Sequence, residues 1–301
     1  MNPAVDVSSS TDVVEPEHKL RCGPSRFDPG GGGVNVTRAI RNLGGSSIAI
    51  YPLGGPSGQA YRGFLEAEGI VGRAVTIAGN TRESFTIDEL STGRQFRFVL
   101  QGPTLREPEW RACLSVVGDM LPVGGYLVAS GSLPPGVPDG FYALLARISA
   151  RNGVRLVVDT SGPALAAALE AGVFLVKPSL RELGELVGAE GALDADQQVA
   201  AAQEIVAEGR AEIVALTLGG AGAVLVSADE VLRLPTPPVE VKSVVGAGDS
   251  FLAALVLRLA QGRSLAEAFR AAVAAGTAAA MVPATELCRA ADVARLEAQL
   301  A

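Results

Sequence analysis

Short apolar runs that alternate with helical patterns constrain the fold of this chain more than any other feature. Four such runs lie at residues 126–130, 156–159, 174–177 and 213–217. Strands that are apolar along their whole length are typical of a parallel sheet covered on both faces. We therefore predict a doubly wound α/β fold, in which a mostly parallel sheet carries helices on both faces.

Each of these runs ends in polar residues or glycine. The four sequences at their ends are Ser130-Gly131-Ser132, Asp159-Thr160-Ser161, Lys177-Pro178-Ser179 and Thr217-Leu218-Gly219. In open α/β sheets, ligands bind outside the carboxyl ends of the strands. We expect these residues to form the rim of a binding site.

Residues 81–100 follow a different pattern, in which Phe85, Ile87, Phe96 and Phe98 alternate with polar residues around Gly93. This pattern predicts a β-hairpin with one buried face. Because an isolated hairpin is marginally stable, it needs a partner. The candidates are the segment 7–27, where we predict a strand near 11–14, and a second subunit.

The stretch 244–251, Val-Val-Gly-Ala-Gly-Asp-Ser-Phe, predicts a glycine-rich turn that opens a helix. The backbone N–H groups at such a helix start are unpaired, and the helix dipole adds positive charge there. The turn can therefore bind an anion such as phosphate. Asp249 in the first turn would place a base beside that anion, although it could also act only as a helix cap.

Composition restricts the partners and the compartment. The chain of 301 residues has a formal net charge of −7, which argues against nucleic acid and anionic membranes as partners. Its three cysteines are scattered without metal-like spacing, and no signal peptide or long apolar run is visible, so we expect a cytoplasmic protein. The chain contains no Gly-Lys dipeptide and hence no P-loop.

Two motifs together resemble those of the ribokinase-like, or pfkB, carbohydrate kinases. A Gly-Gly element followed by Asn35 lies in the four-glycine run at 30–33, and Gly246-Ala247-Gly248-Asp249 lies more than 200 residues later. Further similarities at 2–6, 19–22, 81–82, 130–136 and 177–178 extend over essentially the whole chain and are greatest to the ribokinase-type 6-phosphofructokinase branch. The resemblance implies a single kinase domain over residues 1–301, with a small β-sheet lid formed by segments of about 7–27 and 81–102.

The resemblance also implies a reaction, the ATP-dependent phosphorylation of a ketohexose phosphate, with fructose 6-phosphate converted to fructose 1,6-bisphosphate. Asp249 would be the base, and Gly246, Ala247 and Gly248 would form an anion hole. The residues implied for substrate binding are Asp6, Lys19, Gly30, Gly31, Asn35, Arg82 and Ser132. The lid is expected to pair with its copy in a homodimer.

Cofactor sites follow from the same resemblance. The residues implied for ATP binding are Lys177, Ser179, Thr217, Gly219, Gly222, Val273 and Thr277. Glu182 would hold Mg²⁺ through water, and a potassium ion would lie near Ser243, Val245, Ala279, Val282 and Ala284. The chain departs from the family in having Ser179 where the ATP-side motif Asn-x-x-Glu has asparagine. Relatives also carry a strand before Asn-Pro-Ala-x-Asp, whereas only Met1 precedes Asn2 here. Either the start is assigned late or the first strand is truncated, and a missing central strand would leave unpaired strand edges in the sheet.

Other functions remain open from the residues alone. Fructose 1-phosphate and tagatose 6-phosphate are alternative substrates. A kinase for an uncharged sugar or nucleoside would not need the cations Lys19, Arg21 and Arg82. A non-catalytic sensor of sugar phosphates or nucleotides would not need Asp249 behind its glycine turn.

Overall fold

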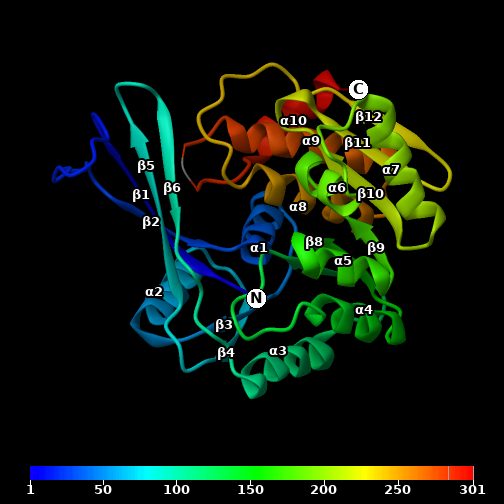
Figure 1. Ribbon diagram of the computed structural model, residues 1–301, viewed down its shortest axis with the longest axis horizontal. Helices are drawn as coiled ribbons and strands as arrows, with labels where there is room; N and C mark the ends of the chain where they lie inside the picture. The colour runs from blue at the N-terminus through cyan, green and yellow to red at the C-terminus, as the bar shows by residue number, and fades with distance from the viewer. Residues whose placement is uncertain (284, 301) are drawn as a thin grey trace.

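A six-stranded sheet forms the centre of the molecule in the computed structural model, which describes residues 1–283 and 285–300 (Figure 1). Its strand order is β12-β11-β10-β9-β8-β7. The strands are β7 (Tyr126–Ser130), β8 (Arg155–Asp159), β9 (Val173–Val176), β10 (Ala211–Thr217), β11 (Ala223–Ser227) and β12 (Val231–Leu234). β7 to β10 are parallel, as predicted, and β11 and β12 add an antiparallel edge. β12 was not expected from the sequence.

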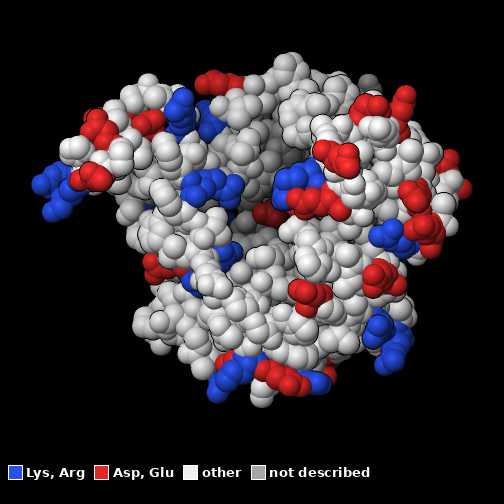
Figure 2. All heavy atoms as spheres, in the orientation of Figure 1, with Lys and Arg blue, Asp and Glu red and all other residues white. Residues whose placement is uncertain are grey.

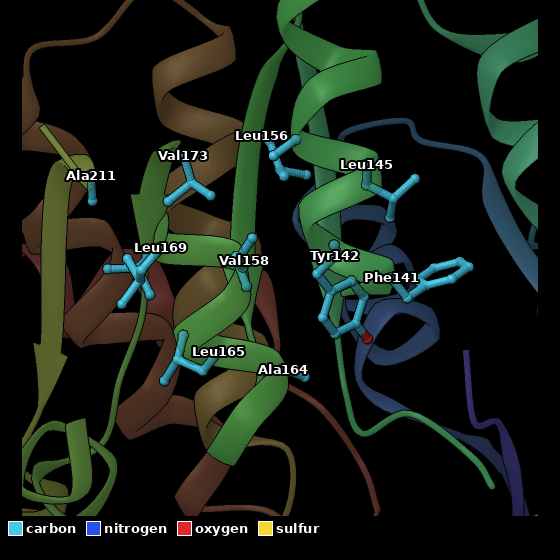
Figure 3. Packing of buried hydrophobic residues seen from close by; sticks show 14 of the residues in the cluster. Phe141, Tyr142, Leu145, Leu156, Val158, Ala164, Leu165, Leu169, Val173 and Ala211 are labelled. Atoms are coloured by element: carbon cyan, nitrogen blue, oxygen red, sulfur yellow. The ribbon is translucent and has the colours of Figure 1, made fainter. Parts of the chain in front are cut away.

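Helices cover both faces of this sheet, and the strand residues alternate between them. Leu156 and Val158 of β8 face α3 (Glu107–Met120), α4 (Phe141–Arg151), α5 (Gly162–Glu170), α6 (Leu180–Leu186) and α7 (Ala195–Ala207). Val157 faces α1 (Gly32–Asn42), α8 (Ala247–Ala260), α9 (Leu265–Ala280) and α10 (Ala290–Gln299). Figure 3 shows part of the first core, where Leu165 and Leu169 of α5 pack beside Val158. The doubly wound prediction is confirmed.

A separate four-stranded sheet stands beside this body, with the order β2-β1-β5-β6 (Figure 1). Its strands are β1 (Ala4–Thr11), β2 (Arg26–Gly30), β5 (Arg82–Glu89) and β6 (Arg94–Val99). The predicted hairpin is confirmed as β5 and β6, and its partner within the chain is β1, which pairs with β5 in parallel. The prediction of a strand near 11–14 was wrong. The strand is formed by residues 4–11, which pair with β2 and β5, and the small polar residues among them weaken the strand pattern in the sequence.

A gap in the sheet system separates β7 from β3 (Ala49–Leu53). β3 pairs with β4 (Gly72–Thr76), which follows α2 (Gly55–Ala67), and within the described residues neither β3 nor β7 pairs on the side facing the other. A cavity of about 430 Å³ lies between them, lined by Ala49, Leu127, Val128 and Met1 among others. The expected unpaired strand edges are thus present.

Among the described residues, no helix has the length and apolar character needed to cross a membrane.

Candidate active site

A cavity of about 200 Å³ lies between the small sheet and the first turn of α8. Its lining residues come from both parts of the fold: Asp6, Gly31, Gly32, Asn35, Arg82, Ser84, Phe85, Thr86, Arg97, Val99, Val245, Gly246, Asp249 and Thr285. Figure 2 shows a hollow in the middle of the molecule, with acidic and basic side chains at its edge. Segments that are more than 200 residues apart in sequence therefore meet at one site.

The first turn of α8 provides the anion-binding geometry expected from the glycine turn. Gly246 is the N-cap with φ 75° and ψ 0°, a left-handed conformation that favours glycine. A Cβ at this position would also lie 2.5 Å from Leu287 Cδ2. Ala247 and Gly248 follow as the first helical residues. Ala247 N makes one long hydrogen bond, to Val244 O at 3.4 Å, and the N–H of Gly248 belongs to the set without an intrahelical partner at the helix start.

Asp249 lies one residue further along α8 and faces the cavity. Asn35 Nδ2 donates a hydrogen bond to Asp249 Oδ2 at 3.0 Å. Burial raises the pKa of Asp249 to about 6, and the nearby charge of Asp159 adds to this effect, while Asn35 and Lys177 oppose it. At neutral pH the carboxylate is therefore ionised, with a pKa that suits a proton acceptor better than the usual value of an aspartate.

Asp6 and the glycine run form the other wall of the cavity. Burial raises the pKa of Asp6 to about 6, against the opposing charges of Arg82, Arg38 and Arg97. A Cβ at Gly30 would lie 1.9 Å from Asp6 Oδ2, so only glycine permits this approach. Gly31, with φ 109°, is the N-cap of α1. A ligand in the cavity can thus contact backbone and a carboxylate at the same wall.

Two arginines of the small sheet bring positive charge to the cavity. Arg82 donates through Nη2 to Asn2 O at 3.1 Å and through Nη1 to Leu100 O at 3.1 Å. Arg97 of β6 also lines the cavity, and sequence reasoning missed it, although its position opposite Thr86 follows once the hairpin register is known. Ser132 is linked to Arg82 through Asn2, whose Nδ2 donates to Ser132 Oγ at 3.1 Å.

Lys19 is not brought to this cavity. It is exposed in the loop between β1 and β2, as is Arg21, and neither residue is among the lining set. In Figure 1 this loop extends away from the central sheet. The single chain therefore supplies Arg82 and Arg97, but not Lys19, to the site.

A buried ion pair lies beside the first turn of α8. Lys177 Nζ is 3.0 Å from Asp159 Oδ1, at the carboxyl ends of neighbouring strands. A Cβ at Gly248 would be 3.4 Å from Lys177 Nζ, so the ammonium lies close to the glycine turn. Burial opposes the charge of Lys177, but the carboxylates of Asp159, Asp249 and Glu182 together outweigh it and raise the pKa of the lysine. Sequence reasoning placed Asp159 on the rim without assigning it a role.

The residues predicted for the nucleotide follow the same edge of the sheet. Ser179 Oγ accepts from Glu182 N at 3.3 Å, and Ser179 N donates to Glu182 Oε2 at 2.8 Å, which caps α6. Thr217 pairs with Ser179 as an isolated bridge, and Gly219 and Gly222 follow it with positive φ. Val273 and Thr277 are buried on α9, where Thr277 Oγ1 donates to Val273 O at 2.8 Å.

The two segments predicted to bind potassium, around residues 243–245 and 279–282, lie side by side and are joined by backbone hydrogen bonds. Ser243 N donates to Ala280 O at 3.3 Å, next to Ala279, and Ser243 Oγ accepts from Val245 N at 3.2 Å. Val282 N donates to Ala279 O at 3.4 Å, whereas Ala284 lies outside the described residues. In the described chain, no group of three or more His, Cys, Asp or Glu side chains could hold a metal ion.

Comparison with known proteins identifies relatives over nearly the whole chain. The family model described as pfkB family carbohydrate kinase matches residues 1–291. The ATP-dependent 6-phosphofructokinase isozyme 2 of Mycobacterium tuberculosis is 44% identical over 295 residues, covering 98% of this chain and 86% of that protein. The isozyme 2 of Escherichia coli is 42% identical over 299 residues, covering 99% and 96%.

Solved structures give the same result. Phosphofructokinase-2 from Escherichia coli in complex with potassium superimposes with a TM-score of 0.95 at 41% identity, covering 100% of this chain and 97% of the other. The same bacterial protein has also been solved with fructose-6-phosphate and as a tetrameric inhibited form.

Proposed function

Because the chain belongs to the pfkB family of carbohydrate kinases, we propose that it transfers a phosphoryl group from ATP to fructose 6-phosphate, giving fructose 1,6-bisphosphate. The observation that carries the proposal is the position of Asp249. Its carboxylate shares one cavity with the α8 N-terminus on one side and two arginines of the small sheet on the other. A phosphosugar needs a cationic group at one end and a base at the other.

Asp249 is the base in this proposal. Its carboxylate takes the proton of the sugar's 1-hydroxyl as that oxygen attacks the γ-phosphorus of ATP, and the bond from the γ-phosphorus to the bridging oxygen of ADP breaks. The N–H groups of Gly246, Ala247 and Gly248 stabilise the negative charge of the transferring phosphoryl group. Because Asp249 is ionised above its pKa of about 6, the base is ready at neutral pH.

Arg82 and Arg97 bind the phosphate that the substrate already carries. Asp6 accepts hydrogen bonds from the sugar hydroxyls, and Asn35 donates a hydrogen bond to one of them. Both arginines belong to the small sheet, which acts as a lid over the cavity. Water solvates a phosphate strongly, so a site must replace that hydration with charged donors, and the guanidinium can donate two parallel hydrogen bonds. Lys19 would contribute from a partner subunit, because its own loop leads away from the cavity.

ATP would lie along the carboxyl edge of the sheet, where Lys177 contacts its phosphates and Ser179, Thr217, Gly219, Gly222, Val273 and Thr277 line the site. Mg²⁺ bound to ATP would neutralise phosphate charge, held by Glu182 through water. Glu182 suits this role because its Oε2 is held by Ser179 N, while its Oε1 has a looser contact, 3.7 Å from Nη2 of the exposed Arg181. Backbone carbonyls around Ser243, Val245, Ala279 and Val282 would hold K⁺, since carbonyl oxygens are suitable ligands for a hard cation.

We further propose a cytoplasmic homodimer that forms through the lid. Apolar side chains on and beside the lid are exposed, including Phe98 at 52% and Phe27 at 49%. Burying such a surface against a second copy would stabilise the hairpin, which alone is marginal.

An assay of ADP release over a panel of sugars tests the function. We expect fructose 6-phosphate to give the highest kcat/KM among fructose 6-phosphate, fructose 1-phosphate, tagatose 6-phosphate, free fructose, ribose and adenosine. Faster turnover of an uncharged sugar or of adenosine would contradict the phosphate clamp. Binding of a phosphosugar without any ADP release would indicate a sensor instead.

A further inference from the structure

Arg38 is a buried guanidinium to which the proposed chemistry gives no role. It lies on α1 with 5% of its surface exposed and does not line the cavity. Its Nε and Nη2 donate to the two carboxylate oxygens of Glu68 at 2.7 and 2.6 Å, and its Nη1 donates to Pro29 O at 3.1 Å. Asp28 Oδ1 is 3.5 Å away and balances part of the remaining charge.

The same Nη1 reaches the active site through one further contact, to Asn35 Oδ1 at 3.4 Å. An amide side chain has an oxygen that only accepts and a nitrogen that only donates. With its oxygen toward Arg38, the amide of Asn35 turns its nitrogen toward Asp249, at 3.0 Å from Oδ2. The flipped amide would set its nitrogen against the guanidinium and its oxygen against the carboxylate, so both contacts would be mismatched.

We propose that Arg38 is a positioning residue that holds the Asn35 amide in the orientation in which its nitrogen donates to Asp249. Asp249 is thereby kept in its proton-accepting form. This inference rests on the proposed role of Asp249 as the base. The other charged groups near that carboxylate are Asp159, Lys177 and Asp6, from β8, the end of β9 and β1. Substitution of Arg38 leaves Asp159 and Lys177 unchanged, but it removes a charge that lowers the pKa of Asp6. An effect on Asp249 therefore comes either through Asn35 or through loss of the Arg38 charge, felt directly or by way of Asp6.

The first test is the pH profile of kcat in Arg38→Met. Without the donor, the amide can flip, and an oxygen facing Asp249 favours the protonated carboxyl. We expect the acid limb to move up by about one pH unit, which makes the variant about fivefold slower at pH 6 and nearly normal above pH 8. The matched control is Arg41→Met, the same substitution one helical turn later on an exposed side chain. A limb that does not move overturns the proposal.

Two further variants separate positioning from structure and charge. Glu68→Gln weakens the ion pair but leaves the contact from Arg38 to Asn35, so it should lower the Tm without moving the limb. In an Asn35→Ala background, Arg38→Met should add no further shift. If the added shift persists there, the effect comes from the charge of Arg38 and the proposal is wrong. If Arg38→Met does not fold, the double variant Arg38→Met with Glu68→Leu replaces it, because it leaves no unpaired carboxylate beside position 38.

Direct titration of the Asp249 carboxyl by ¹³C NMR distinguishes this inference from the proposed function. The carboxyl should titrate about one pH unit higher in Arg38→Met than in the unchanged protein. An unchanged titration overturns the inference even if the enzyme phosphorylates fructose 6-phosphate. A shifted titration supports it even if the preferred substrate is another sugar.

Discussion

Replacing Asp249 by asparagine should abolish most activity and stabilise the protein at neutral pH. Because burial raises the pKa of Asp249 from 3.8 to about 6, ionising this carboxyl opposes folding. A difference of about two pKa units corresponds to about 3 kcal/mol, since each unit is worth about 1.4 kcal/mol. For a chain of this size we expect a rise in Tm of about 5 °C at pH 7.5. Turnover should fall by about 10²–10⁴-fold, as when a positioned base is removed.

The sign of the effect fixes its pH dependence. In the unchanged protein, the neutral Asp249 carboxyl contributes stability that is fully present below about pH 4 and is lost as the pH rises through about 6. The gain in Asp249→Asn should therefore be near zero at pH 4 and largest above pH 7. Calorimetry at pH 4, 6 and 7.5 measures it, with Asp229→Asn on an exposed turn as the matched control. An equal gain at all three pH values would refute burial as the cause, as would a variant less stable at pH 7.5.

Three further predictions test the substrate clamp, the metal and the assembly. Arg82→Ala should raise KM for fructose 6-phosphate at least about tenfold because a charged donor is lost, with KM for ATP nearly unchanged; equal effects of Arg94→Ala, an exposed lid arginine, would contradict this. Glu182→Ala should raise the Mg²⁺ concentration needed for half-maximal rate, whereas Glu185→Ala one turn later should not; identical Mg²⁺ titrations would remove Glu182 from the site. Light scattering at micromolar concentration should give a dimer that Phe98→Asp weakens, and a monomeric mass in the unchanged protein would rule out the lid interface.

The sequence by itself determined the features that depend on local periodicity and spacing. Apolar runs such as the one that became β8 predicted buried parallel strands, because a strand covered on both faces needs no alternation. The glycine turn before Asp249 predicted a helix start with free N–H groups, and α8 begins there. The meeting of Asn35 and Asp249 across 214 residues followed only from the family resemblance, since spacing alone does not say which distant turns come together.

The tertiary structure decided which side chains from separate elements share a site. Asp159 pairs with Lys177 because β8 and β9 are neighbours, and Arg97 faces the cavity because the hairpin register sets it on the same side as Arg82. Lys19 lies away from the cavity because the loop that carries it leaves the small sheet. Arg38 and Asn35 are neighbours three residues apart on α1, but the contacts of Arg38 with Pro29 and Glu68 form only when β2 and the end of α2 pack against that helix. Strand order, register and packing are set by the whole chain, so no local pattern encodes such contacts between separate elements.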